Sequence, residues 1–159
     1  MLGKEIFFSI NDDQNRGSLK IENSRKILTN EEMDFTVIEI KSADKTVNFH
    51  SFLEIDEDSI FSDKIKETKY IYSIQYPKGH VVNYSIGTLV NIKDFYLKYT
   101  VESVVGSSGS PILNLRNYKL LGIHVGAFIR GIKRNIRIGT YIKQIIEKFN
   151  DYYLKFNNN

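Results

Sequence analysis

Residues 106–111 read G-S-S-G-S-P, and this stretch decides how the rest of the chain is interpreted. A serine hydroxyl is a weak nucleophile, so a serine that attacks a carbonyl carbon needs a base and hydrogen-bond donors for the oxyanion. Gly106 permits a tight turn that aims two backbone N–H groups at one point, and Gly109 lets a substrate approach the backbone next to Ser108. Pro111 is suited to begin a strand. By spacing alone, however, a solvated β-turn is the better interpretation.

Two strand-like runs follow the serine and favour the chemical interpretation. Residues 110–115 read S-P-I-L-N-L, and residues 118–126 read Y-K-L-L-G-I-H-V-G after a short polar turn. Similar runs of β-branched and aromatic residues lie between polar turns at residues 4–10, 34–40, 69–74, 81–92, 95–100 and 135–139, the fourth as two half-strands around Gly87. Short strands at this spacing predict an all-β barrel or sandwich.

A helical periodicity begins at Tyr141. Apolar residues recur from there to Phe149 at intervals of three and four, with polar and charged residues between them. This pattern predicts an amphipathic helix, for which Thr140 is a candidate N-cap. In the long loop expected over residues 41–69, residues 56–61 are suited to a short helical turn.

Composition excludes several classes of protein. Of 159 residues, 42% are hydrophobic and none is cysteine, which is typical of a globular domain without disulfides or thiolate metal sites. The net charge is +3, and the basic residues of segment 130–137 alternate with isoleucine, which favours a strand with one solvated face over a nucleic-acid site. No apolar run approaches the ~18 residues that cross a bilayer. Three dispersed histidines offer no metal-ligand spacing. We therefore expect a monomer without metal, cofactor, nucleic-acid partner or membrane association.

The serine loop, followed by a hairpin whose second strand contains G-I-H, resembles the trypsin-like serine peptidases, and most of all the branch with the glutamyl endopeptidases. Further support comes from Q-Y-P-K-G at residues 75–79, Y-S-I-G at 84–87 and I-G-T-Y-I-K-Q-I-I at 138–146. The resemblance covers residues 35–149 well and residues 1–32 loosely. It implies a chymotrypsin-like double β-barrel, with a partial N-terminal barrel over residues 1–68 and a second barrel with a terminal helix over residues 69–153.

The resemblance also implies the site residues. Ser108 matches the nucleophile, and the backbone N–H groups of Gly106 and Ser108 match the oxyanion hole. Asp34, which heads D-F-T-V-I-E-I, matches the aspartate of the catalytic triad, although a turn or strand-cap role is the alternative. His124 and Ser103 would receive an acidic substrate side chain, unless His124 is a strand histidine with its own partner. An extended peptide or protein substrate would pair along Val125, Gly126 and Ala127.

The chain departs from the family in its histidines. The family order is His, Asp, Ser, but no histidine precedes Asp34. His50 and His80 lie in polar stretches where exposure is expected, and His124 belongs to the pocket strand. The family also has another glycine where Val105 stands. We therefore expect a serine endopeptidase whose catalytic histidine lies upstream of Met1, so that these 159 residues alone are nearly inactive.

The alternative is a catalytically inactive homologue that binds extended peptides. The sequence does not determine the cellular compartment of the protein. The cytoplasm is favoured because the sequence has no cysteine and no signal-peptide pattern.

Overall fold

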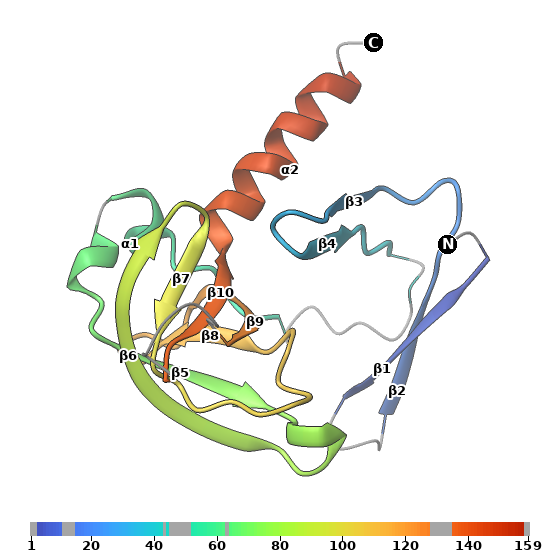
Figure 1. Ribbon diagram of the computed structural model, residues 1–159. Coiled ribbons are helices and arrows are strands. Elements are labelled where there is room, and N and C mark those ends of the chain that lie inside the picture. The colour runs from blue at the N-terminus through green and yellow to red at the C-terminus, as the bar shows by residue number, and fades with distance from the viewer. Residues whose placement is uncertain are drawn as a thin grey trace. The chain divides into compact units, whose positions relative to one another are not determined.

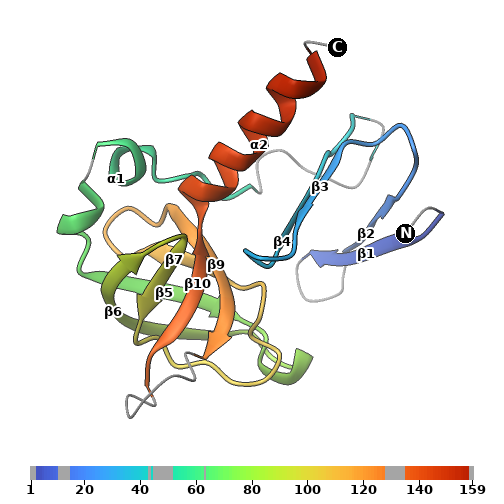
Figure 2. The same ribbon diagram turned by 45° about the horizontal axis from the view of Figure 1, so that its top comes forward.

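The computed structural model of the chain describes residues 3–10, 15–42, 44, 52–62, 64–127 and 135–157. Contacts within the chain divide it into two compact units. One comprises Met1–Asn30 and Thr36–Phe52, and the other comprises Glu31–Phe35 and Leu53–Asn159. Figures 1 and 2 show their elements from two directions.

The first unit contains short antiparallel pairings. Strand β1 (Glu5–Ile10) pairs with β2 (Asn15–Lys20), and β3 (Ile27–Asn30) forms a separate two-stranded sheet with β4 (Phe35–Ile38). β1 and β4 were predicted from their apolar side chains. β2 and β3 were not predicted. The sequence N-R-G-S-L-K of β2 lacks the β-branched residues that favour strands, and β3 has only four residues.

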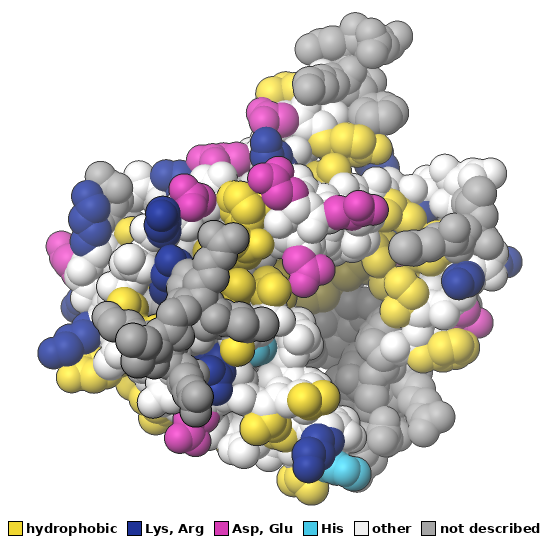
Figure 3. Space-filling model, in the orientation of Figure 1, with side chains coloured by type: hydrophobic (Ala, Val, Ile, Leu, Met, Phe, Trp, Pro, Cys, Tyr) yellow, Lys and Arg dark blue, Asp and Glu magenta, His cyan; other side chains and the backbone are white. Residues whose placement is uncertain are grey.

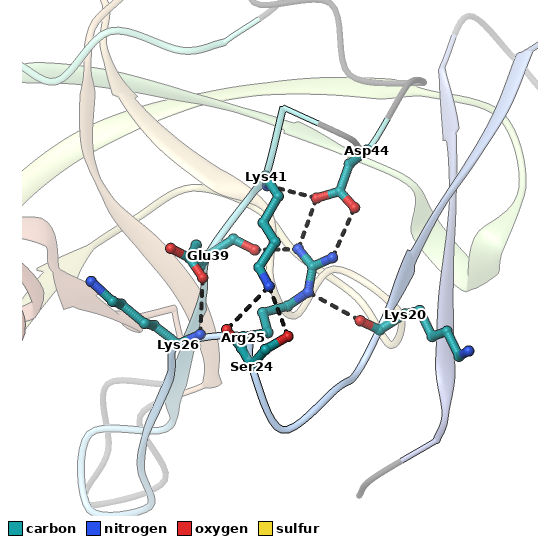
Figure 4. Close-up of polar contacts among 7 residues, drawn as sticks. All are labelled: Lys20, Ser24, Arg25, Lys26, Glu39, Lys41 and Asp44. Carbon is teal, nitrogen blue, oxygen red and sulfur yellow. Dashed lines mark hydrogen bonds and ion pairs between the residues drawn. The ribbon is translucent and has the colours of Figure 1, made fainter.

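Arg25 joins separate segments of this unit (Figure 4). Its guanidinium forms a two-pronged ion pair with Asp44, with N–O distances of 2.7 and 2.8 Å. It also donates to the backbone carbonyls of Lys20 and Glu39. The guanidinium of Arg25 and the backbone N–H of Lys41 lower the pKa of Asp44 to about 2. Because both charged side chains are nearly buried, this network ties the end of β2 to the chain after β4.

The second unit is a closed antiparallel barrel of six strands, in the order β10-β7-β6-β5-β8-β9. The strands are β5 (Tyr70–Gln75), β6 (Asn83–Lys93), β7 (Tyr96–Tyr99), β8 (Pro111–Asn114), β9 (Leu120–Ala127) and β10 (Arg137–Tyr141). Several apolar side chains of these strands are fully buried, namely Ile71, Leu97, Tyr99, Ile112, Leu113 and Leu121. The predicted barrel is confirmed, and Pro111 begins a strand as expected.

The sequence predicted that Gly87 would divide residues 81–92 into two half-strands, and this prediction is wrong. A Cβ atom at this position would lie 2.5 Å from the backbone nitrogen of Val101. Gly87 therefore permits a close approach between β6 and the chain that leaves β7, and β6 continues through it as one strand.

Helices lie at both ends of the barrel sequence. The expected helical turn is α1 (Glu57–Phe61), with Asp56 as its N-cap, and short 3₁₀ turns follow at η2 (Lys64–Glu67) and η3 (Pro77–Gly79). The predicted amphipathic helix is α2 (Ile142–Asn157). Thr140 is not its N-cap, because Thr140 belongs to β10 and its hydroxyl donates to the carbonyl of Met33. Within the described part of the chain, no helix is long and apolar enough to cross a membrane.

Candidate active site

The serine loop between β7 and β8 is fastened by its own hydrogen bonds. Ser107 is fully buried; its backbone N–H donates to Val104 O at 3.0 Å, and its carbonyl accepts from the N–H of Ser110 at 3.2 Å. Two further bonds of 2.8 Å, from Gly109 N–H to His124 O and from His124 N–H to Ser110 O, attach the loop to β9. The loop therefore has one defined backbone conformation.

Ser108 is exposed at the top of this loop. Gly106 and Gly109, on either side of it, have φ angles of 94° and 85°, a region that glycine adopts without steric cost. The Ser108 hydroxyl donates to the carbonyl oxygen of Val125 at 3.0 Å. A base that activates Ser108 would have to take over this proton.

The backbone before Ser108 is fixed by a contact with η3. The N–H of Lys78, in η3, donates to Val105 O at 2.9 Å. Because the peptide bond is trans, the N–H of Gly106 points away from the carbonyl of Val105 and hence away from η3. In the described ranges, neither this N–H nor that of Ser108 has an acceptor. A Cβ at position 106 would lie 2.6 Å from the backbone nitrogen of Lys78, so the position requires glycine.

Strand β9 has one open edge beside the serine. β8 pairs with it only as far as Ile123, whereas β10 continues along its other edge to Ala127. The carbonyl of Val125 faces the open edge, since it accepts the hydroxyl of Ser108. Backbone groups two residues apart in a strand face the same way, so the N–H and C=O of Ala127 also face this edge. Residues 125–127 can therefore accept an added strand.

His124 is buried, with 5% of its surface exposed, and has a partner of its own. Its Nδ1 lies 2.6 Å from the hydroxyl of Tyr99, which also donates to the carbonyl of Ile138 at 3.2 Å. Burial, and secondarily the positive charge of Arg137, lower the pKa of His124 to about 4. His124 is therefore neutral at pH 7.

A cavity of about 500 Å³ lies next to the serine loop, between β5, β6 and the start of β10. Ser103 and Arg137 line it, and Arg137 Nε donates to the Ser103 hydroxyl at 2.8 Å. His124 does not line it. Sequence reasoning missed Arg137, which it treated as one of several basic residues on a solvated strand. The larger cavity, of about 760 Å³, lies around α1 and η2 and contains no residue of the serine loop.

Asp34 lies in the turn between β3 and β4 and is exposed, with φ at 52°. It heads β4, as the sequence predicted. The turn docks on the barrel at two points: Thr140 Oγ1 donates to Met33 O at 2.5 Å, and the Tyr96 hydroxyl donates to Glu32 O at 3.2 Å. Burial of Tyr96, and then the charge of Asp34, raise the pKa of Tyr96. The charge of Asp34 therefore reaches Tyr96, the first residue of β7.

Strand register relates this turn to the serine. Thr140 pairs with Ile123 on β9, and Val125, which holds the Ser108 hydroxyl, follows two residues later. If an imidazole bridged Asp34 and Ser108 with two hydrogen bonds of ~2.8 Å, carboxylate and hydroxyl would be ~7–8 Å apart. That separation stays a prediction.

The remaining expectations concern histidines and charge. His80 is exposed, as predicted, and His50 lies outside the described residues, as do residues 130–134 of the basic segment. Lys and Arg are scattered among acidic and apolar side chains on the face in Figure 3. No cluster of three or more possible metal-ligating side chains occurs among the residues the structure describes.

Comparisons with known proteins identify the fold. No protein-family model matches the chain. A stretch of 65 residues is 34% identical to a glutamyl endopeptidase of Staphylococcus epidermidis, covering 41% of this chain and 21% of that protein. The structure is similar to catalytically inactive tobacco etch virus protease complexed with substrate, with a TM-score of 0.55 and 12% identity over 89% of this chain and 62% of that chain. It is also similar to a serine endoprotease from Yersinia pestis, with a TM-score of 0.53 and 15% identity over 94% and 53%.

The fold is that of the chymotrypsin-like proteases. This confirms the predicted fold class, an all-β chain with a closed barrel and a C-terminal helix. The chain spans about a fifth of the curated relative and roughly half to three-fifths of these solved chains.

Proposed function

We propose that this chain carries the nucleophile, the oxyanion site and the triad aspartate of a serine endopeptidase. The serine loop is the observation that carries the proposal. It presents an exposed Ser108 together with two backbone N–H groups that lack acceptors in the described structure, beside an open strand edge. A solvated β-turn would not need glycine at a position where an added Cβ would lie 2.6 Å from a neighbouring backbone nitrogen.

The proposed reaction proceeds through an acyl-enzyme. A substrate peptide adds to β9 along residues 125–127, with its scissile carbonyl oxygen near the N–H groups of Gly106 and Ser108. A base takes the Ser108 proton as Oγ attacks the carbonyl carbon, and returns it to the departing amine when the C–N bond breaks. Water then cleaves the ester by the same steps, with Asp34 orienting the base throughout.

We propose that the base is a histidine that these 159 residues do not supply. His124 is buried against Tyr99, and His80 lies exposed beyond η3. His50 follows Asp34 in the chain, whereas the family places its histidine before the aspartate.

The second candidate function is peptide binding without cleavage. One observation favours it: the Ser108 hydroxyl donates to the backbone of Val125, so its proton is held by a group that is not a base. The open edge of β9 would hold a peptide in either case.

A comparison of two proteins distinguishes the candidates: the 159-residue chain and a version extended upstream to include a histidine turn. We expect the extended protein to hydrolyse a fluorogenic peptide, and Ser108→Ala to remove that activity. The short chain should be slower by at least ~10³-fold, because without a base only the oxyanion site and binding remain. If the extended protein binds peptides without cleaving them, the second candidate function is supported. Rapid Ser108-dependent hydrolysis by the short chain would contradict the proposal that its base is missing.

A further inference from the structure

The outer face of β5 and β6 lacks the charged side chains that usually cover a solvated sheet. The two strands pair along the whole of β5 (Figure 1). On β5, Ile71, Ser73 and Gln75 are buried, so strand alternation places the residues between them on the outside. Side chains directly opposite each other lie on the same face, so the outward set is Tyr70, Tyr72, Ile74, Tyr84 and Ile86. Because a solvated sheet face is ordinarily polar, this uncharged set requires an explanation.

A fourth tyrosine extends this face from the turn between β8 and β9. The ring of Tyr118 meets the ring of Tyr72 edge to face, with centroids 5.7 Å apart. Tyr118 has a φ of 61°, a region that a bulky side chain seldom adopts, and its ring stays exposed. Burial, and then the phenols of Tyr118 and Tyr84, raise the pKa of Tyr72, so the three groups interact. We call the outward set together with Tyr118 the tyrosine face.

The tyrosine face is large enough for an interface between two chains. Tyr70 has 51% of its surface exposed, Ile86 has 63%, and Tyr84 and Tyr118 have 65% each. Since an aromatic side chain has roughly 200 Å² of surface, these four residues expose about 450 Å². Apolar patches of this size often mark interaction sites. Two copies joined through the tyrosine face and its rim would bury about 1,000 Å² in total, the lower limit for a specific interface.

The chemistry of the tyrosine face suits a second copy of the same face. In a two-fold dimer one patch meets itself, so a charged patch would meet its own sign, whereas an uncharged patch meets no such repulsion. A tyrosine hydroxyl both donates and accepts hydrogen bonds, so tyrosines on the two sides can satisfy each other. The cores of such interfaces are rich in tyrosine and poor in lysine. Lys69, whose Nζ lies 5.4 Å from the ring centroid of Tyr70, belongs to the charged rim.

We infer that the tyrosine face joins two copies of this chain in a two-fold symmetric dimer. The inference does not depend on the proposed function, because it uses no residue of the serine loop. Composition alone favoured a monomer, since a sequence does not show which of its apolar side chains the fold leaves on the outside. An interface near the lower limit of size gives a weak dimer, so we expect a dissociation constant on the order of 10 µM.

Sedimentation velocity of the 159-residue chain, from about 1 µM to about 300 µM, measures this equilibrium. Ile86→Lys places like charges on both sides of the interface and should raise the dissociation constant at least about tenfold. Val90→Lys is the matched control, because Val90 is also exposed on β6 but lies outside the tyrosine face, at the irregularity in the pairing with β7. It should leave the dissociation constant unchanged. A chain that stays monomeric throughout, or a dimer that both variants weaken equally, would overturn the inference.

Cross-linking locates the interface without any substitution. Photo-oxidation of an equal mixture of isotopically light and heavy chains joins tyrosine rings that touch, and mass spectrometry distinguishes links between copies from links within one copy. We expect links between copies among Tyr70, Tyr84 and Tyr118. Links between copies that involve only other tyrosines would overturn the inference. So would a monomer that floats with phosphatidylcholine vesicles unless Ile86→Lys is introduced, because the tyrosine face would then bind lipid and not a second copy.

Discussion

The protonation state of His124 depends on the residues that the fold brings next to it. The motif G-I-H places a histidine on the pocket strand, but only the fold supplies the Tyr99 hydroxyl at 2.6 Å and the nearby charge of Arg137. Both burial and that charge oppose protonation of the ring. The histidine that the resemblance suggests as a partner of an acidic side chain is thus neutral at pH 7.

The lowered pKa of His124 predicts how stability depends on pH. Its pKa is about 4 in the folded chain and about 6.5 in the unfolded chain, so between these values the unfolded state binds more protons. Stability should therefore fall as the pH is lowered through this range. The loss of stability is at most about 3 kcal/mol. It is smaller in practice because solvent in the cavity that Arg137 lines screens the charge of that residue.

Urea unfolding at about pH 7.5 and about pH 4.8 measures this loss. His124→Gln should lose less stability between these two pH values than the unmutated chain does. The matched control is His80→Gln, since His80 is exposed and should leave the pH dependence as it is. Equal pH dependence in the unmutated chain and in His124→Gln would contradict the burial argument.

At the same scale, Ser108 and Gly106 could be proposed as site residues from sequence, whereas the hydrogen bond of Arg137 to Ser103 could not be predicted. The two former residues belong to a motif of consecutive residues whose spacing reflects a local backbone requirement. The position of Arg137 beside Ser103 depends on β10 closing the barrel, a contact between residues 34 positions apart. One sequence contains no local pattern that reports such a contact.

Among the elements, the turn η3 has the clearest relation to the site. The sequence singled out Q-Y-P-K-G only as a point of resemblance, but the structure gives it a physical role. The N–H of Lys78 fixes the carbonyl of Val105, which turns the N–H of Gly106 in the opposite direction. An element about thirty residues upstream of the serine thus orients one donor of the proposed oxyanion site.

Gly106→Ala tests this relation in the extended protein. The new Cβ would meet the backbone of Lys78 at 2.6 Å, so either η3 or the serine loop must move. We expect kcat for peptide hydrolysis to fall by about 10²-fold or more, the usual cost of losing one oxyanion donor. Gly79→Ala is the control, because it has a similar φ of 71° but meets no atom within 4 Å. If the two variants lose the same activity, backbone strain alone explains the effect and the role of η3 is wrong.

The strands divide into those that sequence predicts and those that it does not. The barrel strands were predictable because alternating apolar residues fill a closed interior. β2 was missed because N-R-G-S-L-K has little apolar signal, and β3 was missed because it has only four residues. Gly87 was predicted to interrupt a strand. Its actual role is to permit a close approach to the backbone at Val101, and this contact involves residues from different elements.

At the scale of the whole molecule, the barrel unit contains the site proposed from these residues. The six strands close on themselves, and the turn with Asp34 belongs to the same unit as Ser108. The other unit contains the nearly buried ion pair between Arg25 and Asp44. The similarity to protease structures extends over 89% and 94% of the chain, and it concerns the fold.

Ser108 is proposed to be the nucleophile of a serine peptidase. The most direct test of this proposal treats the upstream-extended protein with a fluorophosphonate, which reacts with an activated serine hydroxyl, and locates the adduct by mass spectrometry of its peptides. We predict one adduct, on Ser108, which Asp34→Asn greatly slows and which the 159-residue chain forms poorly. An adduct confined to another residue, or none on the extended protein, would contradict it.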